Sequence, residues 1–309
     1  MIAAFTLNVS VDRRYVVENS RMNAVNRVKE CTATAGGKGL NVARVIHALG
    51  EKVIAGGIAG GNLGRYVTSE LDREGIQHHF TMAAGESRCC INIIDTLTGT
   101  QTEYLEPGLT VSPEEKALFV QDFDELCAQS SVITISGSLP RGLDTNTYAE
   151  LIERARKAGR PVLLDASGAA LMAGIKSNPY YIKPNEDEIV QLTDCDINND
   201  EQLAEAAMRL HRGGIDRVVV SMGKRGAMMA CSEGVVRGEP PVIKALNTVG
   251  CGDSMTAAFA VAAEKGMTAE EAMRYAVAVS AASAMNPGTG GLNKADFEAV
   301  LPGVKVFRL

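Results

Sequence analysis

The sequence contains no tryptophan, and its seven cysteines include no Cys-x-x-Cys pair. Scattered cysteines in odd number argue against a disulfide framework and against a zinc site. The chain also carries fewer positive than negative charges, because 37 acidic residues outnumber 31 lysines and arginines and leave a formal net charge of −6. Proteins that bind nucleic acid usually present a strongly basic face, so a nucleic acid is not an expected partner.

Long apolar runs and low-complexity tracts are absent as well. The most apolar late stretch, 272–286, contains Arg274 and is too short to span a bilayer. The first residues, MIAAFTLNVSVDRR, predict a strand and not a signal peptide, because no basic segment precedes an apolar one. We therefore expect one large α/β domain covering residues 1–309, in a reduced, cytoplasmic setting with no membrane partner.

Two common nucleotide-binding fingerprints are missing. No segment matches G-x-x-x-x-G-K-[ST], since Gly39 follows Lys38 and Arg225 follows Lys224. No G-x-G-x-x-G follows the first expected strand either. These absences exclude the usual P-loop and dinucleotide-binding motifs, and they make a dehydrogenase a poor alternative.

Strands alternate with helices of ten or more residues along most of the chain, which predicts βαβ units and a mostly parallel sheet. The expected strands are 2–7, 53–58, 132–136, 162–165, 217–222, 227–231 and 242–244, with a strand leading into a helix near 180–192. The expected helices are 38–49, 63–74, 114–127, 146–158, 201–212, 252–265 and 269–285. In such sheets, ligands bind beyond the carboxyl ends of the strands.

Two segments, 11–32 and 88–107, break this alternation with short strand-like stretches and no intervening helix. The second contains the apolar INIID at 91–95 and TEYL at 102–105, separated by the turn-like TLTGT. We interpret both segments as parts of one small sheet that lies over the main domain as a lid.

The sharpest motif is NTVGCGDS at residues 247–254, where the apolar helix expected at 252–265 begins. A glycine-rich helix start exposes backbone N–H groups, and the helix dipole there favours negative charge. The N–H groups of Gly250, Cys251 and Gly252 could therefore hold charge that develops on a transferring phosphoryl group. Asp253 could accept the proton of an attacking hydroxyl or simply cap the helix, and the motif alone leaves both interpretations open.

A second glycine-rich segment, AGGKGLNVAR at residues 35–44, opens the helix expected at 38–49. Gly36 and Gly37 would let a ligand approach the backbone closely. Lys38 and Asn41 would then offer hydrogen-bond donors to hydroxyl groups or phosphate. Taken alone, a glycine turn before an ordinary helix is the slightly favoured interpretation.

Together, the two motifs resemble the signatures of the PfkB-type sugar kinases of the ribokinase-like superfamily. The resemblance runs from Thr6 to about residue 300 and is greatest for the hexose-phosphate branch, the 1-phosphofructokinases and tagatose-6-phosphate kinases. Further segments that match are TLN near the start, SGSLPRG at 136–142 and KPNEDE at 183–188. The resemblance implies a three-layer α/β/α domain with a mostly parallel central sheet and a small β-sheet lid.

The resemblance also implies a role for each matching residue. Asp253 would be the catalytic base, beside an anion hole formed by Gly250, Cys251 and Gly252. The remaining assignments concern the sugar phosphate: Asp12, Gly36, Gly37, Lys38 and Asn41 would bind the sugar, and Arg88, Arg27 and Ser138 its phosphate.

ATP and Mg²⁺ would be the cofactors. The resemblance places the nucleotide against four residues from KPNEDE and SMGKRG: Lys183, Asn185, Ser221 and Gly223. Asn185 and Glu188 would bind Mg²⁺, because both are hard oxygen ligands and their spacing of three puts them on one helical face. Without the resemblance, a helix start with solvated acidic side chains would be the preferred interpretation.

One departure from the family pattern is Cys251, which replaces a common alanine. Its backbone N–H is unchanged. Its thiol, at a helix N-terminus, could have a lowered pKa and be sensitive to oxidation. A small buried residue that takes the place of alanine is the favoured interpretation.

The substrate implied first is fructose 1-phosphate, converted by ATP to fructose 1,6-bisphosphate, because Thr248 stands where tagatose-6-phosphate kinases often carry proline. Tagatose 6-phosphate, phosphorylated on its 1-hydroxyl, is the runner-up. A catalytically silent sugar-phosphate sensor is the alternative from a different class. The retained Asp253 argues against that sensor. The partly apolar lid strands also suggest a homodimer formed through the lid.

Overall fold

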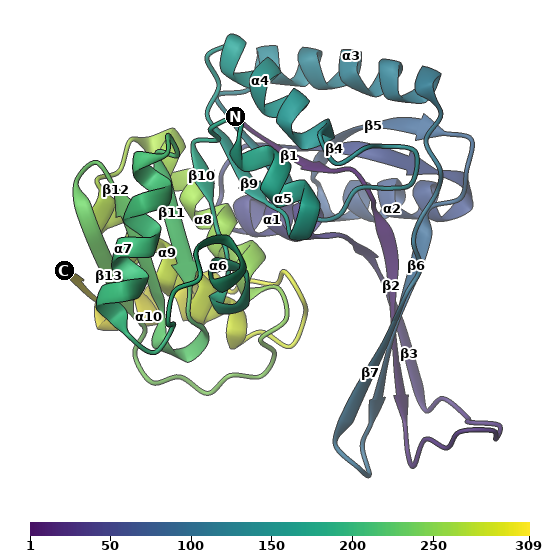
Figure 1. Ribbon diagram of the computed structural model, residues 1–309. Coiled ribbons are helices and arrows are strands. Elements are labelled where there is room, and N and C mark those ends of the chain that lie inside the picture. Colours follow the sequence, from purple (N-terminus) through teal and green to yellow (C-terminus); the bar gives the residue numbers. More distant parts are fainter.

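Ten strands form the larger of two sheets in the computed structural model, which describes all residues 1–309 (Figure 1). The strand order is β14-β13-β12-β11-β10-β9-β8-β1-β4-β5. Neighbouring strands from β5 to β11 are parallel, whereas β11 to β14 pair antiparallel. The bounds are β1 Ile2–Thr6, β4 Val53–Gly60, β5 Gln77–Ala83, β8 Val132–Ser136, β9 Val162–Asp165, β10 Tyr181–Ile182, β11 Arg217–Ser221, β12 Ala227–Cys231, β13 Gly234–Glu239 and β14 Lys305–Arg308.

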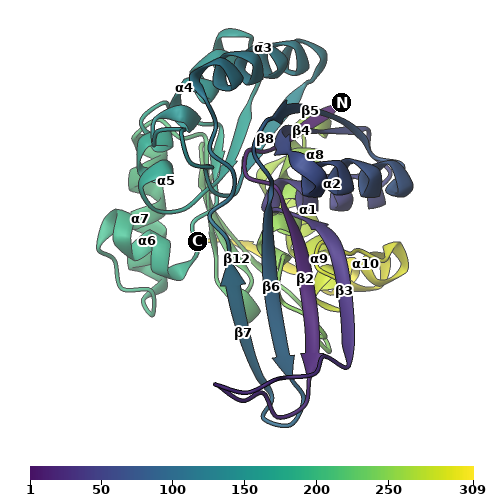
Figure 2. The same ribbon diagram turned by 90° about the vertical axis from the view of Figure 1, so that its right-hand side faces the viewer.

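Helices cover both faces of this sheet (Figure 2). Each face has its own apolar core. Strand β1 shows why, since Ile2 and Ala4 belong to one core and Ala3 and Phe5 to the other. One layer contains α1 Lys38–Ala48, α2 Gly61–Glu74, α8 Cys251–Lys265, α9 Ala269–Ala284 and α10 Lys294–Val300. The opposite layer contains α3 Pro113–Gln129, α4 Thr147–Lys157, α5 Gly168–Ile175, α6 Glu186–Thr193 and α7 Asp200–Arg212.

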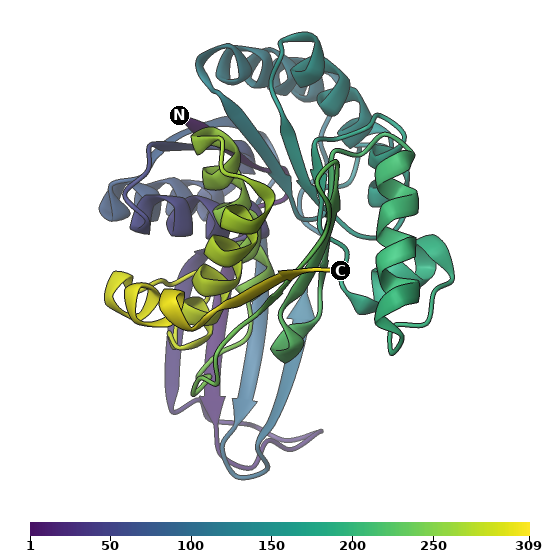
Figure 3. The same ribbon diagram turned by 90° about the vertical axis from the view of Figure 1, so that its left-hand side faces the viewer.

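The two helical layers with the sheet between them are also visible from the opposite side (Figure 3). This arrangement confirms the three-layer α/β/α architecture with a mostly parallel central sheet that the sequence predicted. No helix combines the length and the apolar character that crossing a membrane requires.

The smaller sheet has four strands in the order β3-β2-β6-β7 and extends away from the larger one (Figure 1). Its strands are β2 Ser10–Val17, β3 Glu30–Gly36, β6 Arg88–Asp95 and β7 Thr100–Leu105. The two segments singled out in the sequence, 11–32 and 88–107, thus pair with each other as predicted. Residues 18–29 are not a strand but the long connection between β2 and β3.

The strand predicted at 242–244 is wrong. The chain instead forms β13 at Gly234–Glu239 and then leaves the sheet at Pro240 and Pro241. Proline has no N–H to donate to a strand ladder, so the pair ends the strand. Four elements were not predicted, because each is short or weakly periodic: β5, β14, α5 and α10.

Backbone contact between β1 and β4 depends on a glycine, which gives a test of the packing. Gly57 has a φ of +143°, and a Cβ there would lie 1.9 Å from the carbonyl oxygen of Thr6. Gly50 also has a positive φ, +83°, but no atom lies within 4 Å of its Cβ position. We expect Gly57→Ala to lower the free energy of unfolding by about 2–5 kcal/mol, from backbone strain plus overpacking.

Gly50→Ala is the matched control and should cost only about 1 kcal/mol, because it adds strain without a clash. Urea denaturation of both variants measures the difference. Equal losses of stability would show that the close approach of β1 and β4 is not tight.

Candidate active site

The predicted site residues gather at the carboxyl ends of the central parallel strands, next to the base of the small sheet. Lys38 is the first residue of α1, and Asp165 is the last residue of β9. Lys183 follows β10 directly, and Asp253 lies in the first turn of α8. Parallel topology therefore brings together residues that are far apart in the sequence, as expected for this sheet edge.

Asp253 is buried, with 6% of its surface exposed. Its Oδ2 accepts a hydrogen bond of 2.8 Å from Nδ2 of Asn41. Burial, reinforced by the negative charge of Asp165, raises the pKa of Asp253 to about 6, against the opposing effects of Asn41 and two nearby lysines. A carboxylate with a pKa in this range is suited to accept a proton near neutral pH.

Asp165 is the site residue that sequence reasoning missed. Its Oδ1 lies 3.4 Å from Nζ of Lys38, and its Oδ2 lies 3.5 Å from Nζ of Lys183. Oδ2 also accepts a hydrogen bond of 3.2 Å from Oγ1 of Thr256. Burial raises the pKa of Asp165, but Lys183 and Lys38 lower it further, so that this carboxyl is ionised. The same charge raises the pKa of Lys38.

The turn before α8 brings its backbone close to this cluster of charges. Gly250 has a φ of +85°, and a Cβ on Gly252 would lie 3.0 Å from Nζ of Lys183. The lysine ammonium is therefore beside the N-terminus of α8. Of the three N–H groups expected to form an anion hole, that of Cys251 donates to the carbonyl of Thr248 at 3.4 Å.

The lowered pKa hypothesised for the thiol of Cys251 is wrong. Burial, together with the charge of Asp253, raises the pKa of this thiol to about 11. Burial and the neighbouring carboxylate both disfavour the thiolate form of Cys251. Cys251 is a small, partly buried residue that takes the place of alanine.

On the side of the small sheet, the side chain of Asp12 in β2 lies over Gly36 of β3, which is the partner of Ser10 in the strand pairing. A Cβ on Gly36 would lie 2.2 Å from Cγ of Asp12, so only glycine allows this approach. Oγ of Ser10 donates a 2.6 Å hydrogen bond to Oδ1 of Asp12. Burial raises the pKa of Asp12, while Ser10, Arg88 and Arg44 oppose the rise.

Arg88, at the start of β6, lies close to the main domain. Its Nε donates to the carbonyl of Asn8 at 3.2 Å, and the amide of Asn8 donates to Oγ of Ser138 at 3.2 Å. The predicted phosphate-binding residues Arg88 and Ser138 are thus brought together through one asparagine. Arg27 is not with them: it is exposed in the connection between β2 and β3 and makes no hydrogen bond or ion pair within the chain.

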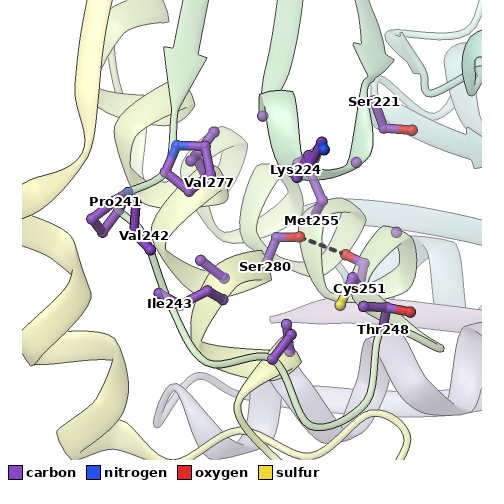
Figure 4. A pocket seen from close by; sticks show the side chains of 17 residues that line it. Ser221, Lys224, Pro241, Val242, Ile243, Thr248, Cys251, Met255, Val277 and Ser280 are labelled. Atoms are coloured by element: carbon purple, nitrogen blue, oxygen red, sulfur yellow. Dashed lines mark hydrogen bonds between the residues drawn. The ribbon is translucent and has the colours of Figure 1, made fainter.

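A cavity of about 630 Å³ opens beside the N-terminal part of α8 (Figure 4). Its polar end is formed by Ser221, Lys224 and Thr248, and its apolar end by residues of the loop after β13. The hydroxyl of Ser280 donates to the carbonyl of Cys251 at 3.1 Å. The full lining is Ser221, Gly223, Lys224, Gly226, Pro240, Pro241, Val242, Ile243, Ala245, Thr248, Cys251, Gly252, Met255, Val277, Ser280, Ala281 and Ala284.

Two predicted nucleotide-binding residues, Ser221 and Gly223, line this cavity together with Cys251 and Gly252 of the glycine turn. Its apolar wall suits a flat heterocyclic base, and its polar end meets the N-terminus of α8, which suits phosphate. Sequence reasoning missed the wall formed by Pro240–Ala245 and by α9, because apolar residues there resemble ordinary core positions.

Asn185 and Glu188, the predicted magnesium ligands, form a capping box at the start of α6. Oδ1 of Asn185 accepts from the N–H of Glu188 at 2.8 Å, and Oε2 of Glu188 accepts from the N–H of Asn185 at 2.9 Å. Oxygen atoms of this type suit Mg²⁺, which usually binds one or two protein carboxylates together with substrate phosphates. No group of three or more acidic, His or Cys side chains gathers to bind a metal alone.

Comparison with known proteins agrees with this geometry. Residues 6–295 match the family described as pfkB family carbohydrate kinase, and the chain belongs to that family. Phosphofructokinase-2 from Escherichia coli, in a complex with potassium, is 30% identical over 98% of both chains, with a TM-score of 0.91.

Two more distant structures share the fold. A possible 1-phosphofructokinase from Thermotoga maritima is 23% identical over 100% of this chain and 99% of its own, with a TM-score of 0.87. Ribokinase from Arabidopsis thaliana, in a complex with ribose and ATP, is 22% identical over 97% of this chain and 98% of its own, with a TM-score of 0.82. The fold is therefore ribokinase-like.

The charge of Asp165 has a measurable consequence for Asp253. Asp165→Asn removes a like charge and leaves the ammonium groups of Lys38 and Lys183 free to act on Asp253. We expect the pKa of Asp253 to fall from about 6 toward its ordinary range. The ¹³C chemical shift of the carboxyl, followed against pH in protein labelled at aspartate, measures this change.

Asp122→Asn, in α3, is the control, because Asp122 contacts His79 and Thr81 away from the site. It should leave the titration of Asp253 unchanged. An unshifted Asp253 in the Asp165→Asn protein would contradict the coupling of the two carboxylates.

Proposed function

We propose that this carbohydrate kinase transfers the γ-phosphoryl group of ATP to a ketohexose phosphate, with fructose 1-phosphate as the first choice and fructose 1,6-bisphosphate as the product. The observation that carries this proposal is the buried Asp253. Asp253 accepts a hydrogen bond from Asn41, and the charges of Lys38 and Lys183 act on it. It stands on a helix whose N-terminal turn borders the cavity.

Asp253 would act as the base. Its carboxylate accepts the proton of the sugar hydroxyl as the hydroxyl oxygen bonds to the γ-phosphorus and the bond to the ADP oxygen breaks. Lys38, Lys183 and N–H groups at the start of α8 would neutralise charge on the transferring group. The contacts of both lysines with Asp165, and of Lys183 with the position of Gly252, support this role. Asn41 holds the carboxylate in position through its 2.8 Å hydrogen bond.

The nucleotide would occupy the cavity, with its base against the apolar wall and its phosphates toward Gly252 and Lys183. Ser221 and Gly223 then lie beside the nucleotide, as the family resemblance implies. Asn185 and Glu188 would bind Mg²⁺ through oxygen atoms, and Mg²⁺, when bound, neutralises charge on the phosphates. The negative charge of Glu188 already acts on Lys38, which supports its nearness to the site.

The sugar phosphate would bind between the small sheet and the main domain. Asp12, with Gly36 and Gly37 beside it, would bind sugar hydroxyls. Arg88 and Ser138 would bind the phosphate, because a guanidinium can grip phosphate with two parallel hydrogen bonds. Arg27 could take part only if the connection between β2 and β3, or a second subunit, brought it to the site.

Two other ketohexose phosphates are alternative candidates for the substrate. The support for fructose 6-phosphate is the structural similarity to Escherichia coli phosphofructokinase-2. That enzyme is 28% identical to this chain, and its structure has been solved in complex with fructose 6-phosphate. Tagatose 6-phosphate remains the alternative from sequence. The choice of fructose 1-phosphate over tagatose 6-phosphate rests on the family resemblance alone, because Thr248 stands where tagatose-6-phosphate kinases often carry proline.

A homodimer formed through the small sheet is part of the proposal. Tyr104 and Leu105 of β7 are 55% and 64% exposed, so this edge of the sheet presents apolar surface that a second copy could cover. A lid role for the small sheet is also part of the proposal, because its strands β2 and β6 carry Asp12 and Arg88. A sensor without catalysis is disfavoured by the complete set of charged groups around Asp253.

Asp253→Asn tests the chemistry. The amide keeps the size and the polar character of the side chain but cannot accept the proton. We expect kcat with fructose 1-phosphate to fall by about 10³-fold or more, because general-base catalysis is typically worth 10²–10⁴-fold. Calorimetric binding of the sugar phosphate should change little. Turnover close to that of the parent enzyme would rule out Asp253 as the base.

Arg88→Ala tests the phosphate clamp. Loss of a charge-assisted contact to phosphate should raise KM for the sugar phosphate by about tenfold or more, with KM for ATP nearly unchanged. Steady-state kinetics with each substrate varied in turn separate the two effects. Arg14→Ala, an exposed residue on the neighbouring strand β2, is the matched control. Equal rises in both KM values would argue against the clamp.

A further inference from the structure

The turn that follows β11 supplies one wall of the cavity, and a single arginine anchors it from outside. Ser221, Gly223 and Lys224 of this turn line the cavity, whereas Arg225 does not. The guanidinium of Arg225 instead pairs with the carboxylate of Glu186 in the first turn of α6. The turn and the start of α6 are therefore joined by a side chain that stays outside the cavity.

Arg225 contacts two further segments. Its Nη2 donates to the carbonyl of Ile197 at 3.1 Å, and its Nη1 lies 3.6 Å from Oδ1 of Asp200, in the first turn of α7. One planar group thus reaches acceptors from three separate parts of the chain. The donors of a guanidinium point in fixed directions in one plane, whereas the three donors of a lysine ammonium rotate on a flexible stem.

A second arginine supports this contact. Arg237 of β13 is 7% exposed and pairs with Oδ2 of Asp200. Its Nε also lies 3.4 Å from a carboxylate oxygen of Glu239. Asp200 is therefore shared between a buried arginine and Arg225, which fixes its direction. Partly buried ion pairs are screened less by salt than exposed ones, so these contacts persist at ordinary ionic strength.

The backbone makes the same connection independently. The N–H of Ser221 donates to the carbonyl of Pro184 at 3.1 Å, and Asn185 and Ser221 form an isolated parallel bridge. The segment with Lys183, Asn185 and Glu188 is thus fastened to the turn with Gly223 at two points, one backbone and one side-chain. Only the side-chain point can be removed without changing the backbone.

We propose that Arg225 is a positioning residue for the nucleotide. It fixes the segment 183–188 relative to the turn 221–226, so that both present their phosphate-binding groups in one geometry. Arg225 itself does not touch the nucleotide in this account. The inference rests on the proposed use of ATP, and it adds a residue that neither glycine-rich motif contains.

The test compares nucleotide and sugar-phosphate affinity in Arg225→Ala. We expect Kd for ADP, measured by calorimetry with Mg²⁺ present, to rise about tenfold, because the segment 183–188 would no longer be held by a side chain against the turn 221–226. Kd for fructose 1-phosphate should stay within about twofold, which is the usual limit for a surface substitution. In kinetics, KM for ATP should rise while KM for the sugar stays constant.

Arg212→Ala is the matched control, since Arg212 forms an exposed ion pair with Glu205 at the other end of α7. It should leave both affinities unchanged. Glu186→Gln provides a second variant that keeps the arginine. If Arg225 acts through Glu186, Glu186→Gln should weaken ADP binding by itself, and the double variant should be less affected than the sum of the single changes.

Two results would overturn the inference: unchanged ADP affinity in both Arg225→Ala and Glu186→Gln, or equal weakening of ADP and sugar-phosphate binding. Loss of folded protein, without a change in Kd for the remaining fraction, would also assign Arg225 to stability alone. A failure of the proposed function itself is distinguishable, because the parent protein would then bind no ADP or phosphorylate no sugar phosphate before any variant is made.

Discussion

The carboxylate of Asp165, held between the ammonium groups of Lys38 and Lys183, is the interaction on which the site depends. A buried charge is costly unless it is paired and hydrogen-bonded, and here two lysines and Thr256 provide that compensation. Lys183 is in turn kept beside the glycine turn of α8, where a phosphoryl group would pass in the proposed reaction. The like charge of Asp165 also contributes to the raised pKa of Asp253. Asp165, at the end of β9, therefore both holds the two lysine side chains and helps to raise the pKa of Asp253.

Sheet topology explains how these residues meet. Strands β8, β9, β10 and β1 are neighbours in the order β10-β9-β8-β1, so the ends of β9 and β10 lie close to the start of α1. The glycines permit close approach of backbone and charge: Gly36 to Asp12, and Gly252 to Lys183. The small sheet then supplies Asp12 and Arg88 from the opposite side. The proposed site therefore lies where the two sheets meet.

Much of this could be predicted from the sequence, for identifiable reasons. The long helices and the buried strands have clear periodicity, and the two glycine-rich motifs are local features that carry their chemistry with them. Asp165 could not be found this way, because VLLD is an ordinary strand end whose partners are distant in the sequence. An acidic residue at the end of a buried parallel strand was the only signal. The raised pKa of Cys251 depends on burial in the folded protein. The strand predicted at 242–244 lies beyond the proline pair that ends β13.

Release of ADP from ATP·Mg²⁺ with a panel of sugars tests the central claim most directly. The panel contains fructose 1-phosphate, fructose 6-phosphate, tagatose 6-phosphate and unphosphorylated fructose. The account predicts the highest kcat/KM for fructose 1-phosphate and the lowest for fructose, which offers nothing to Arg88. Turnover of unphosphorylated fructose equal to that of the sugar phosphates, or no turnover of any of them, would contradict it.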